Sequence, residues 1–133
     1  MFSFDKTFSS YSVNDLAKAK DFYMKILSLD VKETPEGLAL NLSDGSQVFI
    51  YPKPNHTPAT FTVLNFQVSN LEKTVDELAA AGVQFQQYEG ELQTDKKGIA
   101  HSQGKGGPDK IAWFKDPAGN FISVLEDSRK KGW

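Results

Sequence analysis

Apolar residues recur at helical spacing in two stretches of the chain, and they predict helices near residues 14–28 and 70–81. Each stretch reads as an amphipathic helix with one apolar face. The positions that define these faces are Leu16, Ala19, Tyr23, Ile26 and Leu27 in the first stretch, and Leu71, Val75, Leu78 and Ala79 in the second.

Capping residues support both helices. Asn14 or Asp15 can cap the first helix, and Ser69 with Glu72 three residues later forms a capping-box pattern before the second. Gly82 stands where the second helix should end, because glycine readily takes the left-handed conformation found there.

Strand-like runs flank both predicted helices. Asp44-Gly45 is a strong hairpin signal in the first half. In the second half Asp116 can accept backbone hydrogen bonds within a turn, Pro117 presets its own φ, and Gly119 can take a positive φ. The runs are residues 8–13, 38–42 and 47–51 in the first half, and 61–68, 110–114 and 120–125 in the second.

The two halves are repeats of one another. The segment VNDLAKAKDFYMKIL, which starts at Val13, aligns with VSNLEKTVDELAAAG, which starts at Val68, at an offset of 55 positions. The second half is 19 residues longer between its helix and its hairpin. This excess falls in residues 86–110, which hold five glycines and many charges, and we expect either a lid or binding loop, or a solvated excursion.

The motifs within this repeat carry a family resemblance over residues 6–126. They are V-x-D-L at 13–16, Phe22-Tyr23 near the end of the first helix, and D-P-x-G-N at 116–120. The sequence resembles the glyoxalase, bleomycin-resistance and extradiol-dioxygenase superfamily, also called vicinal oxygen chelate proteins. The resemblance implies an α+β fold of two tandem βαβββ modules, about 6–53 and 60–126, with curled mixed sheets around a cavity, in a homodimer.

Metal-using relatives hold a divalent ion with one ligand on each of four strands, typically two histidines and two glutamates. The resemblance maps these positions onto Phe8, Val63, Ile50 within one residue either way, and Ser123. None of these side chains is a competent ligand for a transition metal. We therefore expect no metal and no cofactor.

Strand alternation extends the expected cavity lining beyond these four positions. Ser10, Asn65 and Gln67 supply polar groups if Phe8 and Val63 face the cavity, although Asn65 and Gln67 can equally pair with water at an open edge. Tyr51 lines the mouth or belongs to a linker, and Trp113 is a flat ligand surface or core. The expected ligand-binding set is Phe8, Ser10, Ile50, Tyr51, Val63, Asn65, Gln67, Trp113, Phe121 and Ser123.

Acid–base candidates are few. The sequence contains only His56 and His101, and His101 on the long insert is the better candidate for a general base. No nucleophile–base pair can be recognised from the sequence. The GKGG at 104–107 precedes a strand, so it does not form a phosphate-binding loop at a helix start.

The composition of the chain limits which kinds of partner we expect it to bind. The 133 residues carry a formal net charge of −2 without a basic stripe, which excludes nucleic acid as an expected partner. Cysteine is absent, no apolar run approaches the roughly 20 residues of a membrane helix, and the N-terminus lacks a secretory pattern. We expect a cytoplasmic protein that does not contact membranes.

Three hypotheses for function follow. The first is a metal-independent protein that binds a small apolar or aromatic molecule. The second is a superfamily enzyme, a lyase, isomerase or dioxygenase, whose metal or acid–base site lies elsewhere. The third is a dimeric module with a vestigial cavity. We favour the first because all four expected metal positions lack ligands.

Overall fold

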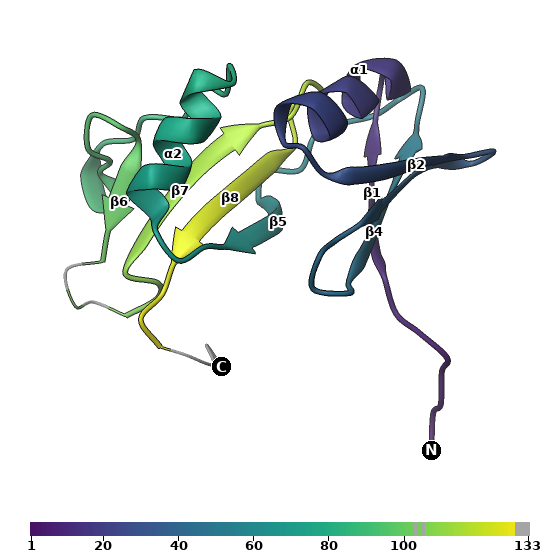
Figure 1. The fold of residues 1–133 in the computed structure, drawn as a ribbon, viewed down its shortest axis with the longest axis horizontal. Helices are drawn as coiled ribbons and strands as arrows, with labels where there is room; N and C mark the ends of the chain where they lie inside the picture. Colours follow the sequence, from purple (N-terminus) through teal and green to yellow (C-terminus); the bar gives the residue numbers. More distant parts are fainter. Residues whose placement is uncertain (103, 105, 130–133) are drawn as a thin grey trace. The chain divides into compact units, whose positions relative to one another are not determined.

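The computed structural model of the protein describes residues 1–102, 104 and 106–129. The chain divides into two units, Met1–Pro58 and Ala59–Trp133. Each unit contains a four-stranded mixed sheet with a helix against one face (Figure 1).

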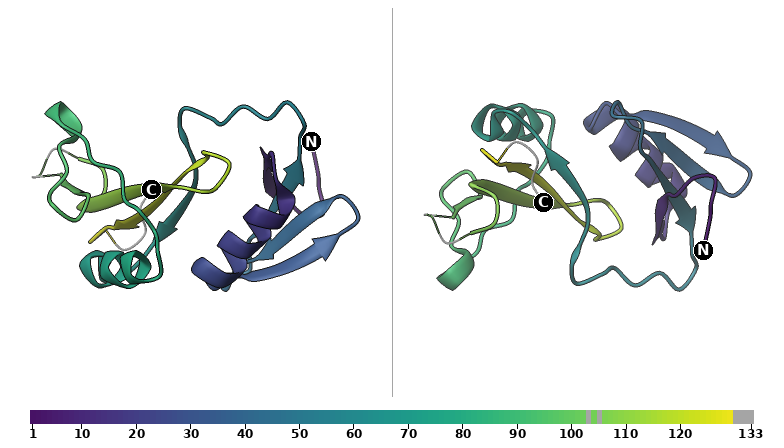
Figure 2. Two further views of the ribbon diagram at one scale, coloured as in Figure 1. Left: turned by 90° about the horizontal axis from the view of Figure 1, so that it is seen from above. Right: turned by 90° about the horizontal axis from the view of Figure 1, so that it is seen from below.

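The first unit has the element order βαβββ. Its sheet order is β1-β4-β3-β2, in which β1 runs parallel to β4 and the other pairs are antiparallel. Figure 2 shows α1 running along one face of this sheet. The elements are β1 (Ser9–Val13), α1 (Leu16–Asp21), a π-helical continuation η1 (Phe22–Ile26), β2 (Asp30–Thr34), β3 (Gly37–Asn41) and β4 (Gln47–Pro52).

The core of the first unit lies between the sheet and its helix. Tyr11 on β1 donates a hydrogen bond from its hydroxyl to that of Tyr23 on η1, at 2.7 Å, and both side chains are buried. Residues that alternate along the strands join Tyr11 on this face, as period-two geometry requires. They are Val13, Leu38, Leu40, Val48 and Ile50, all buried.

The second unit repeats this plan. Its sheet order is β5-β8-β7-β6, with β5 parallel to β8 and the other pairs antiparallel. The elements are β5 (Thr62–Gln67), α2 (Leu71–Ala80), a short 3₁₀ turn η2 (Gly90–Leu92), β6 (Ile99–His101), β7 (Lys110–Lys115) and β8 (Phe121–Glu126).

Helix α2 packs against β7 and β8 and covers one face of the second sheet (Figure 1). It buries Leu71 and Val75. The sheet buries Ile99, Ala112, Phe114, Ile122 and Val124, which share one face by alternation. We call the opposite face, which carries Trp113 and Ser123, the open face because α2 does not cover it.

The expected α+β fold of two repeated βαβββ modules is confirmed, since the two sheets have the same strand order. The structure also corrects several details. The first helix spans residues 16–26, shorter than the expected 14–28, and ends in π-helical geometry. The cap of α2 is Asn70, whose side chain accepts from the Lys73 amide at 3.1 Å, and not Ser69. Asp15 caps α1, and Gly82 follows α2 with φ of 108°.

The long insert of the second unit contains ordered structure that the sequence pattern did not predict. Phe85 forms an isolated bridge with Phe114, and the Gln86 amide donates to the Trp113 carbonyl at 2.8 Å. The chain then leaves the sheet and returns as β6. Within the described residues, no helix is long and apolar enough to cross a membrane.

Candidate functional site

The open face of the second sheet carries two rows of side chains that cross several strands. Asn65, Ser123 and Trp113 stand opposite one another on β5, β8 and β7. The next row consists of Gln67, Leu125, Ile111 and Ala100. Directly opposed residues in a sheet share a face, so the expected grouping of Asn65, Gln67, Trp113 and Ser123 on one face follows from this register.

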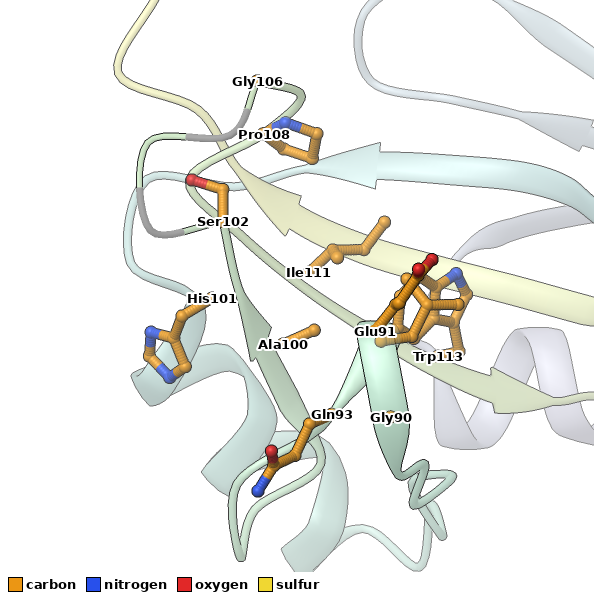
Figure 3. Close-up of a pocket in the computed structure, with 11 residues that line it drawn as sticks. Gly90, Glu91, Gln93, Ala100, His101, Ser102, Gly106, Pro108, Ile111 and Trp113 are labelled. Carbon is orange, nitrogen blue, oxygen red and sulfur yellow. The ribbon is translucent and has the colours of Figure 1, made fainter.

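A pocket of about 500 Å³ lies over β6 and β7 on this face (Figure 3). Its floor contains Ala100, Ile111 and Trp113, and the insert supplies the remaining wall. Of the expected ligand-binding residues, Trp113 lines it. The full lining is Gly90, Glu91, Leu92, Gln93, Ala100, His101, Ser102, Gly106, Pro108, Ile111 and Trp113.

The insert is held over the sheet by its own hydrogen bonds. The ring of Tyr88 meets that of Trp113 edge to face, with centroids 5.7 Å apart. The Tyr88 amide donates to the Thr94 hydroxyl at 2.9 Å, and the Thr94 amide donates to the Tyr88 carbonyl at 3.0 Å. These contacts fix η2 beside Trp113, so the pocket wall is part of the folded unit.

His101, the expected general base, borders the pocket, but its ring points away from Ala100 and Ile111 (Figure 3). Its Nε2 lies 3.0 Å from Asp95 Oδ2. Alternation along β6 explains this orientation, because His101 is opposite Lys110 on the face that α2 covers. A base in this orientation does not face a molecule bound against Ile111.

Asp95 organises the turn before β6. Burial raises the pKa of Asp95, but the interaction with His101 and the amides of Ile99 and Lys97 outweigh it and hold the pKa below its ordinary 3.8. The Ile99 amide donates at 3.0 Å and the Lys97 amide at 2.9 Å, both to Oδ1. The carboxylate therefore fixes the strand entry that positions the pocket floor.

The first unit separates residues that we expected together. Ser10 and Tyr51 lie on the face away from α1, because Ser10 and Ser12 stand opposite Phe49 and Tyr51. Phe8 precedes β1 and is exposed. Ile50 is opposite Tyr11 and is fully buried on the face that packs against the helix. The expected shared face of Ser10 and Ile50 is therefore wrong, and Phe49 and Tyr51, one residue to either side of Ile50, lie on the face of Ser10.

The two remaining expected residues of the second unit are Val63 on β5 and Phe121 at the start of β8. The register between β5 and β8 shifts between Thr62 and Leu64, and Val63 is the extra residue of this bulge. Phe121 pairs with Lys115, whose Nζ lies 5.1 Å from the centroid of its ring. Neither side chain lines the pocket of Figure 3.

The structure brings together one pair that the sequence did not reveal. Ser12 Oγ lies 2.7 Å from His56 Nδ1, although the residues are 44 positions apart. The Lys53 amide donates to the Val13 carbonyl at 2.9 Å and returns the chain across β1. Sequence spacing offers no signal for this pair, since it depends on how the segment after β4 crosses β1.

The residues at the expected metal positions do not fit a divalent ion. Phe8, Ile50 and Val63 have no donor atom, and the buried hydroxyl of Ser123 donates to the Asn65 side chain. Among the residues that the structure describes, no group of three or more His, Cys, Asp or Glu side chains is placed to hold a metal ion. We therefore derive no chemistry through a metal at these positions.

The structure therefore consists of two βαβββ units in tandem, the second of which carries polar and aromatic side chains on its open face. The chain belongs to the Glyoxalase/Bleomycin resistance protein/Dioxygenase superfamily, whose family model matches residues 7–124. The resemblance drawn from the sequence motifs is thus confirmed. A comparison with curated protein sequences finds no match.

Solved structures share the fold at low sequence identity. A putative glyoxalase family protein from Bacillus anthracis superposes with a TM-score of 0.67 at 16% identity, covering 96% of this chain and 100% of that one. The fosfomycin resistance protein FosX from Listeria monocytogenes gives 0.68 at 15% identity, covering 100% of both chains. The antibiotic binding protein TnmS3 from Streptomyces sp. CB03234 gives 0.63 at 19%, covering 96% and 100%.

Proposed function

We propose that the chain is a metal-independent binding protein for a small apolar or aromatic molecule, which it takes up in the pocket over β6 and β7. The observation that carries this proposal is the composition of the pocket. Leu92, Pro108, Ile111 and Trp113 supply apolar and aromatic surface, while Glu91, Gln93 and Ser102 place polar groups beside it. A volume of about 500 Å³ lies within the usual range for small-molecule sites.

The relatives support the class of ligand without naming it. One structure with this fold is described as an antibiotic binding protein and another as a fosfomycin resistance protein. Both descriptions concern small molecules. The four metal positions of this chain carry three hydrocarbon side chains and a hydroxyl, which supports uptake without a metal ion.

A superfamily enzyme is the second candidate, and the Ser12–His56 pair is the observation that favours it. An imidazole nitrogen 2.7 Å from a hydroxyl oxygen can accept its proton and so activate it as a nucleophile. Turnover of a bound compound that is lost in both Ser12→Ala and His56→Gln would support the enzyme over the binder.

The binding proposal is tested by a thermal-shift screen of apolar and aromatic compounds, combined with elemental analysis of the dialysed protein. We expect hits that raise the unfolding temperature without stoichiometric metal. Trp113→Ala should weaken these hits about tenfold, because it removes the largest aromatic surface of the pocket. Ala100→Leu, which fills the floor, should do the same.

Phe61→Ala serves as the matched control, because Phe61 is an exposed aromatic residue of the same unit that does not line the pocket. It should bind like the parent. Stoichiometric zinc, nickel, iron or manganese would refute metal independence. Equal binding by the parent and both pocket variants would place the site elsewhere, and a screen without any hit would support a vestigial cavity.

A further inference from the structure

Ser123 is a polar residue in an enclosed position on the open face of the second sheet. Its side chain is fully buried between Asn65 on β5 and Trp113 on β7. In the described part of the chain its hydroxyl has one side-chain partner, the amide group of Asn65. A buried hydroxyl needs an acceptor for its hydrogen, so this single contact determines how the amide is oriented.

The Asn65 amide has two possible orientations, and only one satisfies Ser123. With Oδ1 toward Ser123, the hydroxyl donates to the amide oxygen, which is the contact that the structure contains. With Nδ2 toward Ser123, the amide would be the donor and the hydroxyl would lose the side-chain acceptor that it has in the structure. The cost of an unsatisfied buried group, on the order of 1–3 kcal/mol, favours the first orientation.

This orientation presents the Asn65 amide nitrogen to the open face. The Asn65 side chain is exposed, and no acceptor among the described residues bonds to its Nδ2. An amide nitrogen carries two hydrogen atoms and no lone pair for accepting. Asn65 therefore directs its amide N–H donors to this point of the face, while its Oδ1 accepts from Ser123.

Asn65 does not line the pocket itself, so only a molecule that extends from Trp113 across β8 reaches it. The two residues stand two strands apart in one row, which corresponds to about 10 Å at the usual strand spacing. This span suits a bicyclic aromatic molecule with one substituent. The carboxylate of Glu91 on the pocket rim disfavours a negatively charged substituent.

From this geometry we infer that the ligand is a planar aromatic molecule that carries a neutral hydrogen-bond acceptor, such as a ketone or amide oxygen, directed to Asn65. The inference rests on the proposed function, and it adds the chemical class of the ligand. Ser123 is a positioning residue, because it acts on the ligand only through the orientation of Asn65.

The test compares 2-acetylnaphthalene with 2-(aminomethyl)naphthalene, which share a ring system and differ in offering an acceptor or a cationic donor. Isothermal titration of the parent should show a preference of about fivefold or more for the acetyl compound. Asn65→Asp places an acceptor where the donor stood and should reverse the preference. Ser123→Ala should reduce it to less than about twofold, since the amide can then turn.

Thermal unfolding first establishes that each variant is folded, and the side-chain amide signal of Asn65 in nitrogen-15 spectra gives a second readout. That signal should shift when the acetyl compound is added to the parent. If the parent binds both compounds equally and Trp113→Ala binds neither, the donor inference is wrong while the proposed function stands. If the parent binds neither compound, the inference is overturned, and the thermal-shift screen decides the proposed function separately. An unchanged preference in Asn65→Asp also refutes the inference.

Discussion

Asp116 shows how much one buried side chain contributes to the turn between β7 and β8. Its Oδ1 accepts from the amides of Ala118 and Asn120, each at 2.9 Å, and its Oδ2 accepts from the Asn120 side chain at 3.0 Å. Asp116 and Asn120 are both buried. Asp116→Ala should lower the free energy of unfolding by about 1–3 kcal/mol, because it removes three hydrogen bonds from the buried turn. Urea unfolding measures this loss.

Asp44 provides the matched control in the first unit. It makes a similar turn contact, with the Ser46 amide donating to its Oδ1 at 3.0 Å, but it is exposed. Water can replace its hydrogen bonds, so Asp44→Ala should cost clearly less stability than Asp116→Ala. Equal losses in the two variants would contradict this account of burial.

The lowered pKa of Asp95 makes the stability of the folded protein depend on pH. The pKa of Asp95 is lowered in the folded protein, so its contribution to stability is present above the ordinary value of 3.8 and is lost as the pH falls through the lowered value. Asp95→Asn should therefore unfold at a lower temperature than the parent at pH 7. This difference should shrink below pH 3.8.

Thermal scans between pH 7 and pH 3 measure the effect. Asp5→Asn is the control, because Asp5 is an exposed carboxylate of the N-terminal segment. It should follow the parent at every pH. A gap between the parent and Asp95→Asn that stays constant down to pH 3 would refute the role given to the carboxylate.

The role of an individual residue could be predicted where it depends only on its neighbours in the sequence. The turn roles of Asp116 and the stop at Gly82 follow from backbone preferences that the sequence contains. The orientation of Ile50 was not predictable by counting from a motif, because it depends on the register between β1 and β4. A shift of one residue moves a side chain to the other face. The direction of the His101 ring depends on the same kind of register.

At the level of elements, Gly98 closes the insert against the sheet. It has φ of 89°, and a Cβ there would lie 2.8 Å from Phe85 Cβ and 3.1 Å from the Gln86 carbonyl oxygen. Gly98→Ala should lower stability by about 2–3 kcal/mol, since backbone strain and a steric clash act together. Gly98→Ala should also weaken ligand binding in the pocket, because the clash would displace β6 and the insert relative to Trp113.

Gly90→Ala distinguishes the cost of backbone strain from the cost of the steric clash. Gly90 has φ of 82°, but nothing lies within 4 Å of a Cβ built there. Its cost should be limited to backbone strain, about 1 kcal/mol. Denaturant unfolding of both variants gives the comparison, and equal costs would show that the contact with Phe85 is unimportant.

Among the elements, the strongly patterned ones were predicted and the short or charged ones were not. Strands β2 and β6 were missed for different reasons. DVKET is mostly polar because β2 is an edge strand, and Ile99–His101 is too short to show alternation. The second of these strands forms part of the pocket floor, so missing it also hid most of the candidate site.

For the whole molecule, we expect a homodimer. Strands β1 and β2 are the outer strands of one sheet, and β5 and β6 are the outer strands of the other. Unpaired edges favour association unless they are covered. Light scattering at tens of micromolar should give twice the 14.8 kDa mass of the chain. A monomer mass throughout a concentration series would contradict this expectation, which comes from the family resemblance.

The repeat made the overall plan accessible from sequence alone, because two related halves must use the same strand order to bury similar apolar faces. Most of the candidate pocket could not be predicted from the sequence. It is built largely from the insert, which belongs to the second half alone and has no counterpart against which its pattern can be checked.

The way this insert meets the sheet has a consequence for laboratory evolution. Gln86 and Gly98 form a narrow neck, and the Gln87 side chain bonds to the Lys96 carbonyl at 3.2 Å just beyond it. Residues 89 and 91–93 lie beyond this neck, so their side chains can change while β6 and β7 keep their pairing. Substitutions at 89 and 91–93 would therefore alter one wall of the pocket with less effect on folding than Gly90→Ala or Asp95→Asn. This segment is the natural place to randomise in a library that selects for altered ligand preference.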